Sequence, residues 1–143
     1  MKKKLLPLAL VFVSMSGMAA DYAITKTATP YSIMGTVRGH SMHRVMGQDY
    51  PRGYRYEPAL VGISWNATVF PKSTGVTAEL CMNRQGASEN CMPITPGSNG
   101  YTQYFNHGVL GYTTNMIIRH TQEGGPARSV PAGSNSVTFH IRY

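Results

Sequence analysis

The strongest constraint on the fold is a two-residue alternation of apolar and polar side chains that recurs along the chain. It is clearest in residues 59–70, and residues 76–82 and 137–143 repeat it. Successive side chains of a β-strand point to opposite faces of its sheet, so this period predicts strands with one buried face. The apolar positions of the first segment are Ala59, Val61, Ile63, Trp65, Ala67 and Val69. Trp65 lies near the middle of this face and is predicted to be buried in the core.

Four weaker segments have a similar composition, and no stretch keeps a helical period for three turns. These segments are residues 22–28, 31–38, 101–105 and 114–120. Clusters of Gly, Pro, Asn and Ser separate the segments, as they do between strands. About seven short strands predict an all-β fold, either a small antiparallel β-sandwich or a partly open barrel. Residues 71–75 have turn chemistry and predict a hairpin between the segments at 59–70 and 76–82.

The first twenty residues predict a cleavable secretory signal peptide. Three lysines at positions 2–4 precede an apolar run over residues 5–13, and Ala19 and Ala20 are small residues suited to cleavage. The apolar run is about half the length of a membrane-spanning helix, so no stable membrane anchor is expected. We therefore expect residues 21–143 to form a single β domain in the periplasm.

The charge balance of the chain bears on its partners. The chain carries a net charge of +7, but three of its 13 basic residues belong to the predicted signal peptide. The other basic residues are scattered along the domain rather than gathered in one patch. An exported domain with this mild charge is not expected to bind nucleic acid. The charge is expected mainly to keep the domain soluble, with some attraction to acidic partners or lipid surfaces.

Cys81 and Cys91 are the two cysteines of the chain. An even count in an exported protein predicts a disulfide bond between them. Residues 83–90 are polar and rich in turn formers, so the bridge is expected to tie the base of a hairpin. Redox-active pairs favour the spacing Cys-x-x-Cys, which this pair does not have. The bridge is therefore predicted to be structural.

Residues 39–58 show no clear period and are interpreted as one long loop, a kind of segment that is often functional. Its first half offers candidate copper ligands: His40, Met42, His43 and Met46. Imidazole and thioether groups together favour Cu(I). However, His40 and His43 point to opposite faces of an extended chain, and methionine recurs elsewhere in the sequence. A metal site is therefore kept as an alternative, and no cofactor is expected.

The second half of this segment gathers aromatic and basic side chains: Tyr50, Arg52, Tyr54, Arg55 and Tyr56. Tyr and Arg are enriched among the residues that dominate binding energy in protein interfaces. We expect this group to contact a protein partner. An alternative interpretation is that the tyrosines fold back as a lid over the core, which a small β domain often needs.

Catalytic residues are not indicated. Glu79 lies on the polar face of a predicted strand and Glu89 in a predicted hairpin loop, and no serine lies in a strand-turn-helix elbow. His107, His120 and His140 are isolated in the sequence, and His140 is predicted to be solvated on the polar face of the last strand. We therefore expect a protein without enzymatic activity.

From Trp65 onward, the order of features resembles that of the FlhE family of periplasmic flagellar proteins. These features are the strand at residues 61–65, Leu80-Cys81 with Cys91, the turn at residues 123–126, and residues 133–137 before the last strand. The resemblance implies a non-enzymatic accessory protein of flagellar assembly. Such a protein would bind protein partners near the flagellar export apparatus and limit proton leakage through it. The alternatives are a periplasmic copper-binding module and a secreted inhibitor or adhesin-like binding domain.

Overall fold

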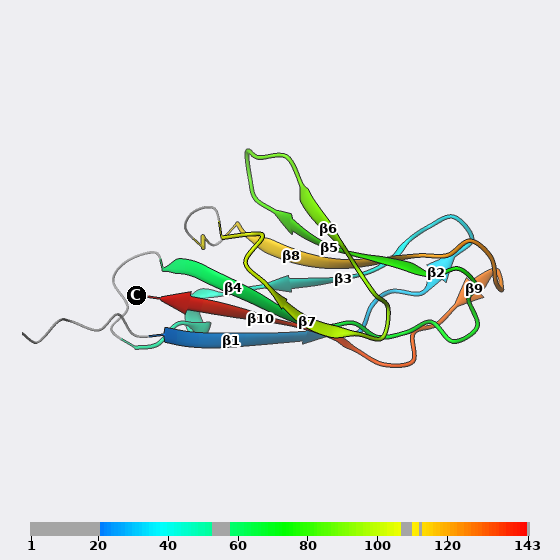
Figure 1. The fold of residues 1–143 in the computed structure, drawn as a ribbon, viewed down its shortest axis with the longest axis horizontal. Coiled ribbons are helices and arrows are strands. Elements are labelled where there is room, and N and C mark those ends of the chain that lie inside the picture. The colour runs from blue at the N-terminus through cyan, green and yellow to red at the C-terminus, as the bar shows by residue number, and fades with distance from the viewer. Residues whose placement is uncertain (1–20, 53–57, 107–109, 112, 143) are drawn as a thin grey trace, which may run out of the picture.

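The computed structural model describes residues 21–52, 58–106, 110–111 and 113–142, and these residues form ten β-strands (Figure 1). In chain order they are β1 (Asp21–Ala28), β2 (Ile33–Met34), β3 (Gly39–Arg44), β4 (Ala59–Asn66), β5 (Thr77–Asn83), β6 (Asn90–Ile94), β7 (Asn99–Thr102), β8 (Asn115–Thr121), β9 (Arg128–Ser129) and β10 (Asn135–Arg142). A short 3-10 helix, η1 (Gly47–Asp49), follows β3. Within these ranges, no helix has the length and apolarity needed to span a bilayer.

The strands form two four-stranded antiparallel sheets that pack as a sandwich. The first sheet has the order β1-β10-β4-β7, the second sheet has the order β3-β8-β5-β6, and β2 pairs with β9. Figure 1 shows β1 (blue), β10 (red) and β4 (green) running along one layer, with β2 and β9 together at one end of the molecule. β1 also contacts β3, so the two sheets approach each other along that edge. The predicted all-β antiparallel fold is confirmed, and its architecture is that of a sandwich.

The core lies between the sheets and consists of the inward-facing positions of the alternating strands. In β10, Val137, Phe139 and Ile141 are fully buried, as the two-residue period predicts. Leu80 and Ile118 of the second sheet are fully buried opposite the first sheet. Burying one such side chain is worth about 1.5–3 kcal/mol, so this layer is the main source of stability.

β4 departs from the predicted alternation at one residue. Ile141 pairs with Leu60 and His140 pairs with Gly62, so Val61 bulges out of the ladder. The bulge places Leu60 in the core, and Val61 is only half-buried. The prediction that Ala59 and Val61 face the core is therefore wrong, because an extra residue in one strand shifts the alternation by one position. Val69, which was predicted on the same face, lies beyond the end of β4 and is 40% exposed.

Trp65 lies at the margin of the core rather than at its centre. It is half-buried and packs against the core cluster. Its register partners are Val137 in β10 and Gly100 in the short edge strand β7. A Cβ atom on Gly100 would overlap the indole ring, so the absence of a side chain there gives the ring its place. Full burial of Trp65 was expected from the sequence pattern and is corrected, because only β7 lies beyond β4 in the sheet.

The connection between β4 and β5 crosses from one sheet to the other. β4 pairs with β10 and β7, whereas β5 pairs with β6 and β8. The hairpin predicted around residues 71–75 is therefore wrong. The chain leaves β4 held by other segments, with the Ala67 amide donating to the Ser98 carbonyl at 2.9 Å. Turn-forming residues reverse the chain direction, but they do not decide which sheet the next strand joins.

The loop expected over residues 39–58 is also corrected. Its first six residues, Gly39–Arg44, form β3 and pair with β8 along their whole length. The inward positions of β3 are Gly39, Ser41 and His43, all buried. Because none of them is aliphatic, the period of β3 is invisible to a hydrophobicity pattern.

Candidate functional site

β3 divides the candidate copper ligands between two faces of its sheet. His43 is buried on the inner face, whereas Met42 is 55% exposed on the outer face. His40 is on the outer face as well, with its ring 5.1 Å from the ring of Tyr31. Met46 lies beyond the strand, at the start of η1. The four side chains therefore do not converge on one point.

His43 takes part in an ordered chain of buried hydrogen bonds. Its Nδ1 lies 3.0 Å from the Lys26 carbonyl, which can only accept, so Nδ1 carries the proton. Its Nε2 then accepts from the Ser41 hydroxyl at 2.9 Å. Ser41 Oγ accepts from Asn135 Nδ2 at 2.8 Å, and Asn135 Oδ1 accepts from the Thr68 amide at 2.8 Å. Burial lowers the pKa of His43, against the opposing effect of the hydrogen bond to Lys26. The chain is complete only when His43 is neutral.

The predicted partner-binding group is placed only in part. Tyr50 packs against the core, and its hydroxyl donates to the Leu110 carbonyl at 3.4 Å. Arg52 is exposed. Tyr54, Arg55 and Tyr56 lie outside the described residues. For Tyr50, this position matches the lid interpretation, in which the side chain covers the end of the core.

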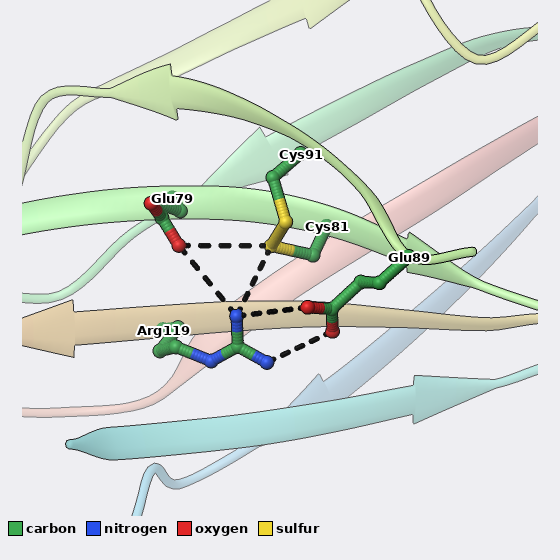
Figure 2. Close-up of polar contacts among 5 residues, drawn as sticks. All are labelled: Glu79, Cys81, Glu89, Cys91 and Arg119. Atoms are coloured by element: carbon green, nitrogen blue, oxygen red, sulfur yellow. Dashed lines mark hydrogen bonds and ion pairs between the residues drawn. A yellow bond between two sulfur atoms is a disulfide. The ribbon is translucent and has the colours of Figure 1, made fainter.

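The predicted disulfide is confirmed and lies on the outer face of the second sheet. Cys81 and Cys91 are bonded and are register partners in β5 and β6. Figure 2 shows Arg119 of β8 beside the bridge, with Nη1 3.6 Å from Cys81 Sγ. The guanidinium donates to both Glu89 oxygens, at 2.8 and 3.2 Å, and Glu79 lies 3.6 Å away. The hydrogen bond from Arg119 lowers the pKa of the Glu89 carboxyl. Together, the disulfide and the ion pairs of Arg119 link β5, β6 and β8.

The same cluster brings Glu79 Oε2 within 3.9 Å of Cys81 Sγ, a grouping that resembles a metal site. Metal ions bind cysteine as the thiolate, and both sulfurs are already used in the disulfide bond. One carboxylate remains, and it is paired with Arg119. The arrangement therefore acts as a structural cross-link.

A polar hollow of about 600 Å³ opens on the outer face of the first sheet. The bulge in β4 organises it, because Val61 has no register partner in β10 and its carbonyl is free to accept from side chains. The Tyr101 hydroxyl donates to this carbonyl at 3.1 Å, and Asn106 Nδ2 donates at 2.6 Å. The bulge thus fixes two polar side chains at the rim of the hollow.

His140 lies at the floor of this hollow. Its register neighbours are Ala23 in β1 and Gly62 in β4. The small side chain of Ala23 leaves space beside His140, whereas the Tyr101 ring covers Gly62. Its Nε2 lies 2.7 Å from Ser64 Oγ, and its ring meets the Tyr101 ring edge-on at 5.5 Å. A hydrogen bond between a serine and a histidine is also found in catalytic triads, where a carboxylate orients the histidine. Among the described residues, however, no carboxylate is hydrogen-bonded to His140, so the triad is incomplete.

An exposed ion pair closes one end of the hollow. Arg142 Nε donates to Asp21 at 2.7 Å, and its Nη2 donates to the same carboxylate at 3.3 Å. The hydrogen bond from Arg142 lowers the pKa of Asp21. Sequence reasoning missed this site because its residues come from four strands. His140 was expected to be merely solvated, and only the register shows that it lies between two very small residues.

Comparison with known proteins supports the fold. No protein-family model matches the sequence, and no curated protein matches it. Among solved structures, the crystal structure of FlhE matches with a TM-score of 0.56 and 17% sequence identity. The match covers 87% of this chain and 98% of that chain. This chain therefore has the fold of FlhE, the protein whose family its sequence resembles.

Proposed function

We propose that this protein is an exported, non-enzymatic accessory of flagellar assembly. In this role it binds protein partners near the flagellar export apparatus and limits proton leakage through it. The observation that carries the proposal is the likeness to FlhE, which extends over 87% of this chain and 98% of that one. A shared fold alone does not fix a function, so the order of motifs in the sequence and the chemistry of the surface add to the argument.

The polar clusters of the structure support a binding role over a catalytic one. Arg119 is neutralised by Glu89, and Arg142 by Asp21, so neither guanidinium is left poised for a reacting group. The disulfide fits an oxidising compartment such as the periplasm. We propose that residues 50–56 contact the partner, with Tyr50 anchored on the core and Arg52 exposed beside it.

The proposal is tested first by deleting the gene and restoring it. A deletion strain should swim less and should acidify its cytoplasm faster in acidic medium, as measured by a pH-sensitive fluorescent protein. Export of the wild-type chain should restore both properties. A deletion strain with normal motility and normal cytoplasmic pH would contradict the flagellar role.

A photo-crosslinking amino acid at position 52 tests the proposed contact segment. We expect light-dependent adducts with components of the flagellar export apparatus or basal body. Lys72 is the matched control, because it is an exposed basic residue beyond the opposite end of β4. Adducts at position 72 but not at position 52 would move the partner surface to the other end of the sandwich.

A further inference from the structure

A polar groove runs along the outer face of the first sheet, with Tyr101 in the middle. The hollow around His140 lies on one side of Tyr101 and has a volume of about 600 Å³. A second hollow of about 500 Å³ lies on the other side and shares Tyr101 with the first. Each volume falls in the range of ordinary ligand sites. Together they offer room for a chain of several units rather than for one compact molecule.

Tyr101 is built as a flat platform between the two hollows. Its ring crosses Gly62, where a Cβ atom would overlap the ring. The hydroxyl is tied to the Val61 carbonyl at 3.1 Å, and the edge contact with His140 fixes the ring plane. The side chain nevertheless stays 53% exposed. The hydroxyl hydrogen bond and the contact with His140 hold the ring in one orientation, with one face open to solvent. Stacking of another flat group on this face therefore costs little conformational entropy.

The hydrogen-bonding groups around this platform are hydroxyls and amides. The second hollow is lined by polar side chains of this kind: Ser64, Asn66, Asn99, Ser136 and Thr138. In the first hollow, Gln103 and Asn106 take the same role. Asn106 donates through Nδ2 to Val61, and its Oδ1 is buried without a hydrogen-bond partner. The lining of both hollows therefore offers hydroxyl and amide groups that can donate hydrogen bonds to a polar ligand and accept them from it.

The charges of the groove argue against ionic ligands. Asp21 and Arg142 neutralise each other, and the residues described around the second hollow carry no charge. Peptides that bind to sheets usually add to an edge strand or insert side chains into apolar pockets. This groove lies on the face of the sheet, where β10 and β4 already use their backbone groups in the ladder.

We propose that this groove binds a neutral polysaccharide, with one pyranose ring stacked on Tyr101 and neighbouring units in the two hollows. The apolar face of a sugar ring suits the exposed face of the tyrosine, and its hydroxyls suit the surrounding Ser, Thr, Asn and Gln side chains. The inference does not depend on the flagellar role, because none of residues 50–52 lines either hollow and sugar binding is tested on the isolated protein.

The test is an NMR titration of the isotope-labelled protein, purified after export, with two soluble sugars. The probes are chitohexaose, which is β-1,4-linked, and maltohexaose, which is α-1,4-linked. We expect one of them to produce saturable shifts at the amides of Gly62, Tyr101 and His140. Tyr101→Ala should weaken the affinity by about tenfold or more, since it removes the platform. Tyr101→Phe should keep most of it.

Two further variants separate binding from folding. Ala23→Gln adds a side chain at an exposed position of the first hollow and should abolish binding without lowering the melting temperature. Tyr104→Ala is the matched control, because Tyr104 is also exposed but its hydroxyl donates to Asn90, outside the groove. Two results would overturn the inference: no saturable shift with either sugar, or unchanged affinity in Tyr101→Ala.

Discussion

At the scale of single residues, His43 links the two sheets through hydrogen bonds that need its neutral form. Its Nδ1 donates to the Lys26 carbonyl of β1 in the first sheet, and its Nε2 accepts from Ser41 of β3 in the second sheet. Ser41 accepts in turn from Asn135 of β10, in the first sheet. Protonation would turn Nε2 from an acceptor into a donor and leave the hydroxyl hydrogen of Ser41 without its acceptor. His120 is buried in the same interior, and its Nε2 meets the Thr68 carbonyl at 3.0 Å. The free energy of unfolding should therefore depend on the protonation of both histidines.

We predict that the free energy of unfolding falls as the pH is lowered. Burial holds the pKa of His43 and of His120 below the ordinary value of 6.5. Below pH 6.5 these histidines bind protons in the unfolded chain but stay neutral in the folded one, so protons favour unfolding. The free energy of unfolding is therefore highest above pH 6.5 and declines below it. Urea denaturation at several pH values from about 8 to about 5 measures the slope. His43→Gln should be less stable at pH 8 but show a shallower slope, and an unchanged slope would contradict the role of His43.

The intrinsic fluorescence of the protein reports on the packing of Trp65, because Trp65 is the only tryptophan of the chain. We predict that Gly100→Ala destabilises the fold by about 1–3 kcal/mol, since its Cβ would overlap the indole ring. The fluorescence maximum should shift to longer wavelength as the ring is displaced toward water. Gly124→Ala is the control, because a Cβ atom there would meet no neighbour. Equal stability and equal spectra for both variants would show that the ring is free to move.

At the scale of elements, the hairpin of β5 and β6 depends on its covalent tie. β6 is an edge strand of the second sheet, and Pro93 within it has no amide hydrogen to donate to a ladder. Figure 1 shows this hairpin rising from the sandwich at the top of the view. The bridge from Cys81 to Cys91 joins register partners one pair away from the turn between the two strands, where it holds β6 against β5.

We predict that the double variant Cys81→Ala, Cys91→Ala loses about 2–3 kcal/mol of stability, the amount expected for closing a loop of this length. Hydrogen exchange should rise most in β6 and least in β10, which lies inside the first sheet. Glu89→Gln is the control, because it removes the ion pair with Arg119 but keeps the bridge. That pair is partly exposed and should cost less than about 1 kcal/mol. A double variant as stable as the wild type would refute the structural role of the bridge.

At the scale of the whole molecule, the predicted signal peptide determines whether the chain is exported and where the mature domain begins. We predict that the protein recovered from the periplasm begins at Ala20 or Asp21, as N-terminal sequencing will determine. Asp21 is the first residue of β1 and pairs with Arg142 at the end of β10. Leu8→Arg interrupts the apolar run and should leave the chain unprocessed in the cytoplasm. Retention of Met1 in the exported protein would contradict the signal peptide.

The sequence by itself determined the features that neighbouring residues encode. The alternation at residues 137–143 predicted which face of β10 is buried, and Val137, Phe139 and Ile141 lie there. The cysteine count predicted the disulfide bond. These inferences succeed because the direction of a side chain in a strand depends only on its position along that strand, and an even cysteine count is a property of composition.

Only the tertiary structure decided which strands are partners and what their outer faces form. β4 and β5 adjoin in sequence but lie in different sheets, and β3 is a strand despite its buried Ser41 and His43. The bulge at Val61 creates the hollow, because it frees one carbonyl and brings Gly62 opposite His140. Pairing and register are set by contacts between residues far apart in the chain, and no local pattern carries that information.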